Sequence, residues 1–141
     1  MDTIIFVCHG NICRSPMAEF IAKHLDKKHR YNYISRATSL EEIGNDIYYP
    51  AKVTLDRHNI PYTHRGASRV TLDEFRGAKH IFVMDYNNLS YLKRLFPNED
   101  FSKVSLLANK EIEDPWYTGN YEKVYKEIET SIIHFLSEEK I

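Results

Sequence analysis

The hydrophobic pattern near the start of the chain changes from a short apolar run to a helical repeat. Residues 4–7 (IIFV) are continuously apolar, which is typical of a strand buried on both faces in a parallel sheet. Ser15 followed by Pro16 predicts a helix start, with Ser15 as the N-cap and Pro16 as the first helical residue. Apolar residues then recur at helical spacing, at Met17, Phe20, Ile21 and Leu25. The order is therefore strand, loop, helix.

The rest of the chain repeats this alternation. Further strands are predicted over residues 31–35, 80–84 and 103–107. Helices are predicted over residues 50–58, 87–96 and 121–137. A short helix near Phe75 is expected to begin at Thr71, where Glu74 completes a capping box. Alternating strands and helices predict an α/β fold: a four-stranded parallel sheet with helices on both faces, in one domain over residues 1–141.

The loop after the first strand carries a candidate nucleophile, Cys8, and a candidate anion ligand, Arg14. Backbone N–H groups at a helix N-terminus lack partners and the helix dipole adds positive charge, so this loop favours an anion. Thiols ionise readily in such a field, and the arginine fork can grip two phosphate oxygens. Gly10 and Asn11 suit a tight turn with positive φ. The loop predicts attack by sulfur on a phosphoryl group, giving a phosphocysteine that water hydrolyses.

The segment VCHGNICRSPMAE resembles the phosphate-binding loop of the low-molecular-weight protein tyrosine phosphatases. The resemblance continues in order through SRATSLEEIGN, RHNIPYTHR, IFVMDYNNL and EDPWYTGNYEKVY, so it covers nearly the whole chain. It implies a phosphatase of phosphotyrosine in proteins that needs no metal or cofactor. It also implies that the phosphate is bound by the loop residues His9, Gly10, Asn11, Ile12, Cys13 and Arg14.

The same resemblance implies a general acid, Asp114, which matches the Asp-Pro motif of the family. A phenolate or alkoxide leaves poorly unless it is protonated, so such an acid is required. Trp116 and Tyr117 are expected to flank a planar leaving group, and Pro115 to stiffen their loop. Without the resemblance, an Asp-Pro pair is more often plain turn chemistry.

Supporting residues are expected around the nucleophile. Besides capping the helix, the Ser15 hydroxyl is expected to hydrogen-bond to the Cys8 sulfur. Asn11 is expected to adopt the left-handed conformation. The resemblance adds Ser35 and His64 as hydrogen-bonding partners of Asn11, although His64 alone would be interpreted as an exposed loop histidine.

Three residues in or near the loop, His9, Glu41 and Cys13, suggest hypotheses about substrate recognition and oxidation. His9 replaces the leucine usual in the family. Glu41 replaces an aromatic residue that walls the substrate cleft in many members, and a carboxylate there would repel acidic peptides. Arg65, Trp116 and Tyr117 are therefore expected to contribute more to substrate recognition. Cys13 is either a small core residue or, as we hypothesise, the partner of Cys8 in a disulfide formed under oxidants.

Composition excludes several other classes. A net charge of −1 argues against broad nucleic-acid binding, and no apolar run approaches the roughly 18 residues of a membrane span. The N-terminus does not resemble a signal peptide, so a cytoplasmic location is expected. Two cysteines five residues apart cannot form a secreted disulfide framework, and the paired ligand clusters of a zinc site are missing.

The loop suggests four candidate functions. A thioredoxin-linked arsenate reductase would need two further cysteines, and none follows Cys13. A protein arginine phosphatase typically carries threonine at the position of Ile12, so Ile12 and the paired aromatic residues favour phosphotyrosine. A phosphocysteine carrier would have no use for Asp114. The favoured interpretation is a tyrosine phosphatase acting on a tyrosine-phosphorylated protein, with a tyrosine kinase as a further candidate partner.

Overall fold

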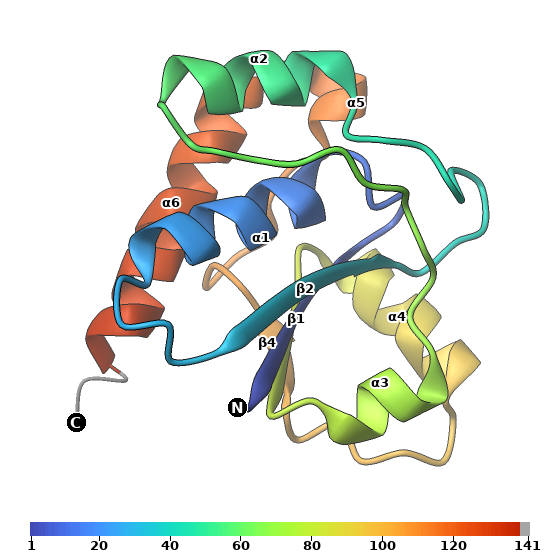
Figure 1. Ribbon diagram of the computed structural model, residues 1–141. Helices are drawn as coiled ribbons and strands as arrows, with labels where there is room; N and C mark the ends of the chain where they lie inside the picture. The colour runs from blue at the N-terminus through green and yellow to red at the C-terminus, as the bar shows by residue number, and fades with distance from the viewer. Residues whose placement is uncertain (139–141) are drawn as a thin grey trace.

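The computed structural model describes residues 1–138 and has a central parallel sheet covered by helices on both faces (Figure 1). The strands are β1 (Thr3–Cys8), β2 (Asn32–Ala37), β3 (His80–Val83) and β4 (Val104–Leu106), in the order β2-β1-β3-β4. The predicted α/β fold and four-stranded parallel sheet are confirmed. All four strands end at the same edge, where ligands of such sheets bind.

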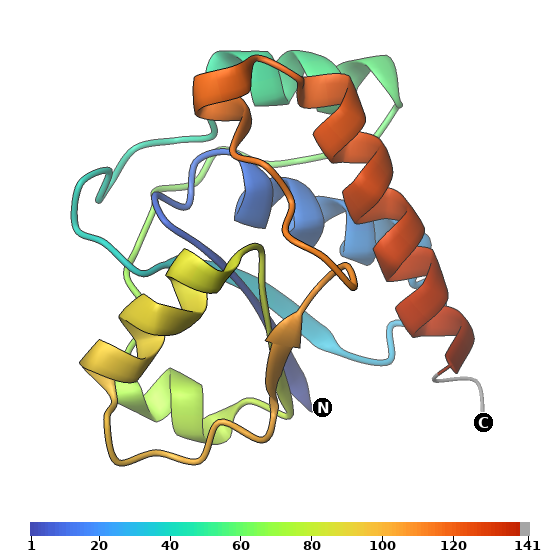
Figure 2. The same cartoon turned by 180° about the vertical axis from the view of Figure 1, so that it is seen from behind.

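Two helical layers enclose the sheet (Figures 1 and 2). One layer contains α1 (Arg14–Leu25), α2 (Tyr49–Arg57) and α6 (Tyr121–Glu138), and the other contains α3 (Leu72–Gly77) and α4 (Tyr86–Leu95). In β1, Ile4 and Phe6 pack in the first layer, whereas Ile5 and Val7 pack in the second. This division explains the continuous apolar run. Over residues 1–138, no helix combines the length and apolar character needed to cross a membrane.

Most predicted boundaries lie within one or two residues of the structure. The predicted capping box of α3 is present, with Thr71 and Glu74 each bonding the other's backbone N–H. Strand β2 extends two residues beyond its predicted end, to Ala37, because hydrogen bonding to β1 continues after the apolar run stops. One short helix, α5 (Pro115–Thr118), has no counterpart in the sequence prediction.

The predicted start of α1 is wrong. The helix begins at Arg14, and Cys13 in the N-cap position makes no side-chain capping bond. Ser15 therefore lies inside the helix, where its hydroxyl bonds Cys8 and Asn11 instead of a backbone N–H. Pro16 is the third helical residue and is tolerated because N–H groups of the first turn need no intrahelical acceptor.

Just beyond α1, a fully buried carboxylate, Asp26, joins the helix to β2. It accepts hydrogen bonds from the Tyr33 hydroxyl at 2.8 Å and from the backbone N–H and Nε of Arg30 at 2.9 and 3.2 Å. Burial alone would raise the pKa of Asp26, but these hydrogen bonds outweigh it and hold the pKa below its ordinary value. The ionised form therefore stabilises the folded state at neutral pH.

We expect Asp26→Asn to lower the free energy of unfolding at pH 7 by about 3 kcal/mol, because Arg30 loses its buried charged partner. The wild-type advantage should shrink as pH falls below about 4 towards the lowered pKa, since the carboxylate is then protonated. Urea unfolding at pH 7 and at pH 3 measures this difference. Asp56→Asn is the matched control, because exposed Asp56 also accepts from a tyrosine, Tyr62, at 3.1 Å. Equal losses in both variants would contradict the prediction.

Candidate active site

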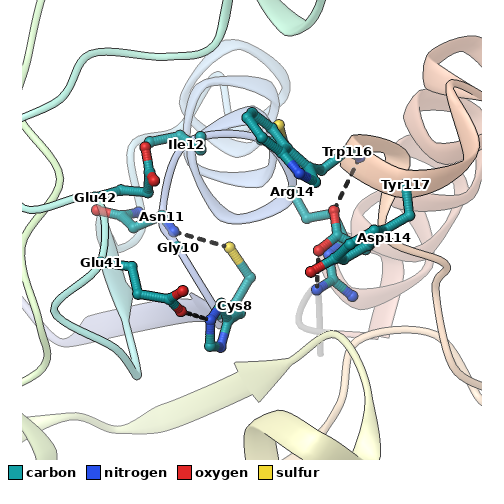
Figure 3. Close-up of a pocket in the computed structure, with 12 residues that line it drawn as sticks. Cys8, Gly10, Asn11, Ile12, Arg14, Glu41, Glu42, Asp114, Trp116 and Tyr117 are labelled. Atoms are coloured by element: carbon teal, nitrogen blue, oxygen red, sulfur yellow. Dashed lines mark hydrogen bonds and ion pairs between the residues drawn. The ribbon is translucent and has the colours of Figure 1, made fainter.

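A pocket of about 140 Å³ opens at the carboxyl edge of the sheet (Figure 3). Its walls come from the loop between β1 and α1, the segment after β2, and the start of α5. The lining residues are Cys8, His9, Gly10, Asn11, Ile12, Cys13, Arg14, Glu41, Glu42, Asp114, Trp116 and Tyr117. The fold thus brings most of the predicted site residues together from three distant segments.

The loop over residues 9–13 offers backbone donors to this pocket. The N–H groups of Gly10, Ile12, Cys13 and Arg14 have no acceptor anywhere in residues 1–138. On its outer side, the loop carbonyls are bound: His9 O accepts from Ser39 N–H at 3.1 Å and Ile12 O from Tyr48 N–H at 2.9 Å. Unpaired donors at the N-terminus of α1 form a site for an anion.

Asn11 gives the loop its shape. It has φ of 60°, so its predicted left-handed conformation is confirmed. Its Nδ2 donates to Ser15 Oγ at 2.7 Å and to Ser35 Oγ at 3.0 Å. The expectation of positive φ at Gly10 is wrong. A Cβ at Gly10 would lie 3.3 Å from Glu42 Cγ, a tight contact that the Glu42 side chain would have to shift to relieve.

The Cys8 side chain points into the pocket (Figure 3). Its sulfur accepts a hydrogen bond from Asn11 N–H at 3.3 Å, and its thiol donates to Ser15 Oγ at 3.0 Å. When the thiol loses its proton, the Ser15 hydroxyl can donate to the sulfur in return. The surroundings of Cys8 thus supply donors that stabilise a sulfur anion.

The second cysteine of the loop has different surroundings. Burial raises the pKa of Cys13 to about 12, although a contact of 3.7 Å between its sulfur and the Tyr121 hydroxyl works in the opposite direction. Cys13 is therefore a neutral thiol near pH 7. Both cysteines are free, and their pairing under oxidants stays a prediction.

Arg14 is 2% exposed and is held at three points. Nη1 donates to Asp85 Oδ2 at 2.7 Å and to the Ile112 carbonyl at 2.8 Å, and Nη2 lies 3.5 Å from Asp114 Oδ2. Burial alone would lower the pKa of Arg14. The negative charges of Cys8, Asp114 and Asp85 outweigh this effect and raise the pKa above its ordinary value. The position of Asp85 just after β3 places it at this sheet edge from the sequence alone, but the sequence does not show that it binds Arg14.

Asp114 approaches the pocket from the side opposite the loop (Figure 3). It caps α5, since its Oδ1 accepts the Trp116 N–H at 3.0 Å. The Trp116 ring packs against Tyr48 at a centroid distance of 4.6 Å, and Tyr117 is 82% exposed at the mouth. Both aromatic residues line the entrance to the pocket.

The expected hydrogen bond between His64 and Asn11 is wrong. His64 has an 88% exposed side chain, and its Nδ1 bonds Asp46 at 2.8 Å. Two residues that follow His64 in the sequence contact Asn11 instead. Ser68 N–H donates to the Asn11 Oδ1 at 3.2 Å, and Arg65 Nη2 donates to the Asn11 carbonyl at 2.5 Å. Arg65 does not line the pocket, and its predicted part in substrate recognition stays a prediction.

The two unusual residues of the mouth bind each other. His9 Nε2 is hydrogen-bonded to the exposed Glu41 carboxylate, and the His9 ring lies 5.8 Å from the ring of Tyr91. Glu42 lines the same side of the pocket. Two carboxylates, those of Glu41 and Glu42, therefore lie on this rim.

Comparison with known proteins identifies the family. A family model described as low molecular weight phosphotyrosine protein phosphatase matches residues 3–141. The phosphatase of that name from Gallus gallus is 38% identical over 142 residues, covering 90% of this chain and 89% of that protein. The crystal structure of SP-PTP, a low molecular weight protein tyrosine phosphatase from Streptococcus pyogenes, has a TM-score of 0.93 at 34% identity, covering 98% of this chain and 93% of that chain.

One similar structure carries a different activity in its name. The Drosophila arginine phosphatase DARP has a TM-score of 0.87 at 27% identity, and the match covers 100% of this chain and 99% of that chain. The family model, in contrast, spans nearly all of the chain under the tyrosine phosphatase description. The chain therefore belongs to the low molecular weight phosphotyrosine protein phosphatase family.

Proposed function

We propose that this protein hydrolyses phosphotyrosine in proteins through a phosphocysteine intermediate on Cys8. One observation carries the proposal. A sulfur atom, a set of unpaired backbone N–H groups, the anchored guanidinium of Arg14 and the carboxyl group of Asp114 all line one pocket. The combination provides a nucleophile, an anion cradle and an acid.

In the first step, the phosphate dianion binds to the loop N–H groups and to Arg14, which neutralise its charge. The Cys8 thiolate attacks phosphorus, and an S–P bond forms as the P–O bond to tyrosine breaks. Asp114, in its protonated form, gives its proton to the departing phenolate oxygen. The products are phosphocysteine, an Asp114 carboxylate and free tyrosine hydroxyl.

In the second step, water attacks the phosphocysteine. The Asp114 carboxylate takes a proton from the water as the new P–O bond forms, and the S–P bond breaks to return the thiolate. Ser15 supports this departure, because its hydroxyl lies 3.0 Å from the sulfur and can donate to it. Inorganic phosphate then leaves, and Asp114 again carries its proton.

The entrance supports an aromatic substrate. Trp116 and Tyr117 form an exposed aromatic wall beside Asp114, suited to a flat phenol ring. The buried, apolar Ile12 side chain adds no polar group to the loop. Phosphoarginine is the second candidate substrate, because the similar structure DARP is named an arginine phosphatase.

We expect two peptides of the same sequence, one with phosphotyrosine and one with phosphoarginine, to differ at least about tenfold in kcat/KM, in favour of phosphotyrosine. Phosphate release is measured with a chelator present, and Cys8→Ser protein prepared in parallel corrects for contaminating activity. The same assay with Glu41→Gln shows whether the acidic rim affects the choice. Faster release from phosphoarginine would transfer the proposal to the second candidate, and release that is independent of Cys8 would remove it.

A further inference from the structure

Arg65 is a partly buried cation on the outer side of the phosphate-binding loop, with two carbonyl contacts. Its Nη2 donates to the Asn11 carbonyl at 2.5 Å and its Nη1 to the Asn45 carbonyl at 3.2 Å. Its own N–H donates to Asp46 Oδ1 at 3.2 Å, which fixes the backbone from which the side chain extends. A single guanidinium thus joins two segments behind the loop.

The bound carbonyl determines where the next N–H points. The carbonyl of Asn11 and the N–H of Ile12 belong to one peptide unit, and no peptide bond within residues 1–138 is cis, so the two groups point in opposite directions. Arg65 holds the carbonyl outside the loop, and the unpaired Ile12 N–H is therefore directed to the inner side. A flipped peptide would turn a carbonyl oxygen, rather than a donor, towards the anion.

This bond differs from the others on the outer side of the loop. The carbonyls of His9 and Ile12 are held by the backbone N–H groups of Ser39 and Tyr48, whereas the Asn11 carbonyl is held by a charged side chain. Burial lowers the pKa of Arg65, and the charges of Glu19, Asp46 and Cys8 counteract this effect. Arginine stays protonated at neutral pH even so, and its charge lies within electrostatic reach of the sulfur.

We propose that Arg65 is a positioning residue that directs the Ile12 N–H towards bound phosphate and places a second positive charge behind Cys8. The inference rests on the proposed function for its consequence in catalysis, but not for its test. On the pocket side, the charged and titratable groups near Cys8 are His9, Cys13, Arg14, Glu41, Glu42 and Asp114, with Asp85 bonded to Arg14. Behind the loop, Arg65 is the cation, and the carboxylates of Glu19 and Asp46 act on it.

The test uses two measurements on the free protein that need no turnover. Calorimetry gives the affinity for inorganic phosphate, and alkylation by neutral iodoacetamide, followed at Cys8 by mass spectrometry from pH 4 to 9, gives the fraction of reactive thiolate. We expect Arg65→Met to bind phosphate about tenfold more weakly, since a charged hydrogen bond that orients a donor is lost. The midpoint of alkylation should rise by about 0.5 pH unit or more.

Arg65→Lys separates geometry from charge. Lysine keeps the charge but lacks the planar fork that reaches both carbonyls, so the alkylation midpoint should return towards wild type while phosphate binding stays weakened. Arg69→Met is the matched control: Arg69 is exposed on the same segment, and its side chain has no hydrogen bond or ion pair with residues 1–138. This control should match wild type in both measurements. If Arg65→Met does not fold, Arg65→Gln allows the same measurements.

Unchanged phosphate affinity and alkylation midpoint in Arg65→Met, even with a lower melting temperature, would reduce Arg65 to a structural brace and overturn the inference. A change in affinity alone would overturn the part concerning charge, and a change in midpoint alone would overturn the part concerning the Ile12 N–H. Both effects could occur in a protein that fails to release phosphate from phosphotyrosine. That result would refute the proposed function and leave the role of Arg65 standing.

Discussion

Cys8→Ser is expected to lower kcat/KM for a phosphotyrosine peptide by at least about 10⁴-fold, because a serine hydroxyl stays protonated at neutral pH and attacks phosphorus poorly. The loop N–H groups and Arg14 are unchanged by this substitution, so the variant should still bind inorganic phosphate. Rapid quenching of the wild-type reaction in acid should trap one phosphate on the peptide that contains Cys8. Turnover assays, calorimetry and mass spectrometry measure the three results.

Cys13→Ser is the matched control for this loss. Cys13 lies in the same loop, but with a pKa of about 12 its thiol is not the attacking group, so we expect a loss of no more than about tenfold. A phosphate trapped on Cys13, or Cys8→Ser protein that keeps more than a few per cent of its turnover, would contradict the assignment of the nucleophile.

Asp114→Asn should reduce kcat for a phosphotyrosine peptide by about 10²- to 10³-fold, because asparagine cannot protonate the phenolate as it leaves. The loss should be much smaller for an aryl phosphate with an acidic phenol, which departs without protonation. Steady-state kinetics with a series of substituted aryl phosphates tests the dependence on the leaving group.

The neighbouring carboxylate provides the control. Glu113 is bonded to Lys123 and Asn120, which hold its pKa at about 2, so Glu113→Gln should leave kcat within about threefold of wild type. A carrier of phosphate on cysteine would be indifferent to Asp114→Asn. Equal losses on good and poor leaving groups would mean that Asp114 acts on binding and not as the acid.

The fold could be predicted because its main signal is local. A parallel strand covered on both faces must be apolar at successive positions, and β1 and β3 satisfy this rule. The position of β2 could be predicted but its end could not, because its last two residues pair with β1 without belonging to an apolar run. α5 has only four residues and shows no helical periodicity, so its only signals are at its ends: the Asp114 cap, Pro115 at the first helical position and Gly119 just after the last.

The site residues likewise divide into those that a local motif predicts and those that it does not. Cys8, Asn11 and Arg14 lie within seven residues, so one short stretch of sequence is enough to predict that they share a site. The partners of that stretch depend on tertiary contacts. A shift of one position along the segment after α2 decides between Arg65 and His64 as the residue that faces Asn11, and hydrophobic patterning does not specify that shift.

The carboxylate of Asp85 performs two tasks at once. Its Oδ1 accepts the Asn88 N–H at 2.8 Å and caps α4, while its Oδ2 holds Arg14 at 2.7 Å. Fraying of the first turn of α4 would therefore loosen the guanidinium that grips phosphate. By thermodynamic reciprocity, an anion that fixes Arg14 must suppress that fraying by the same free energy. A helix that does not line the pocket thus becomes more rigid whenever the pocket is occupied.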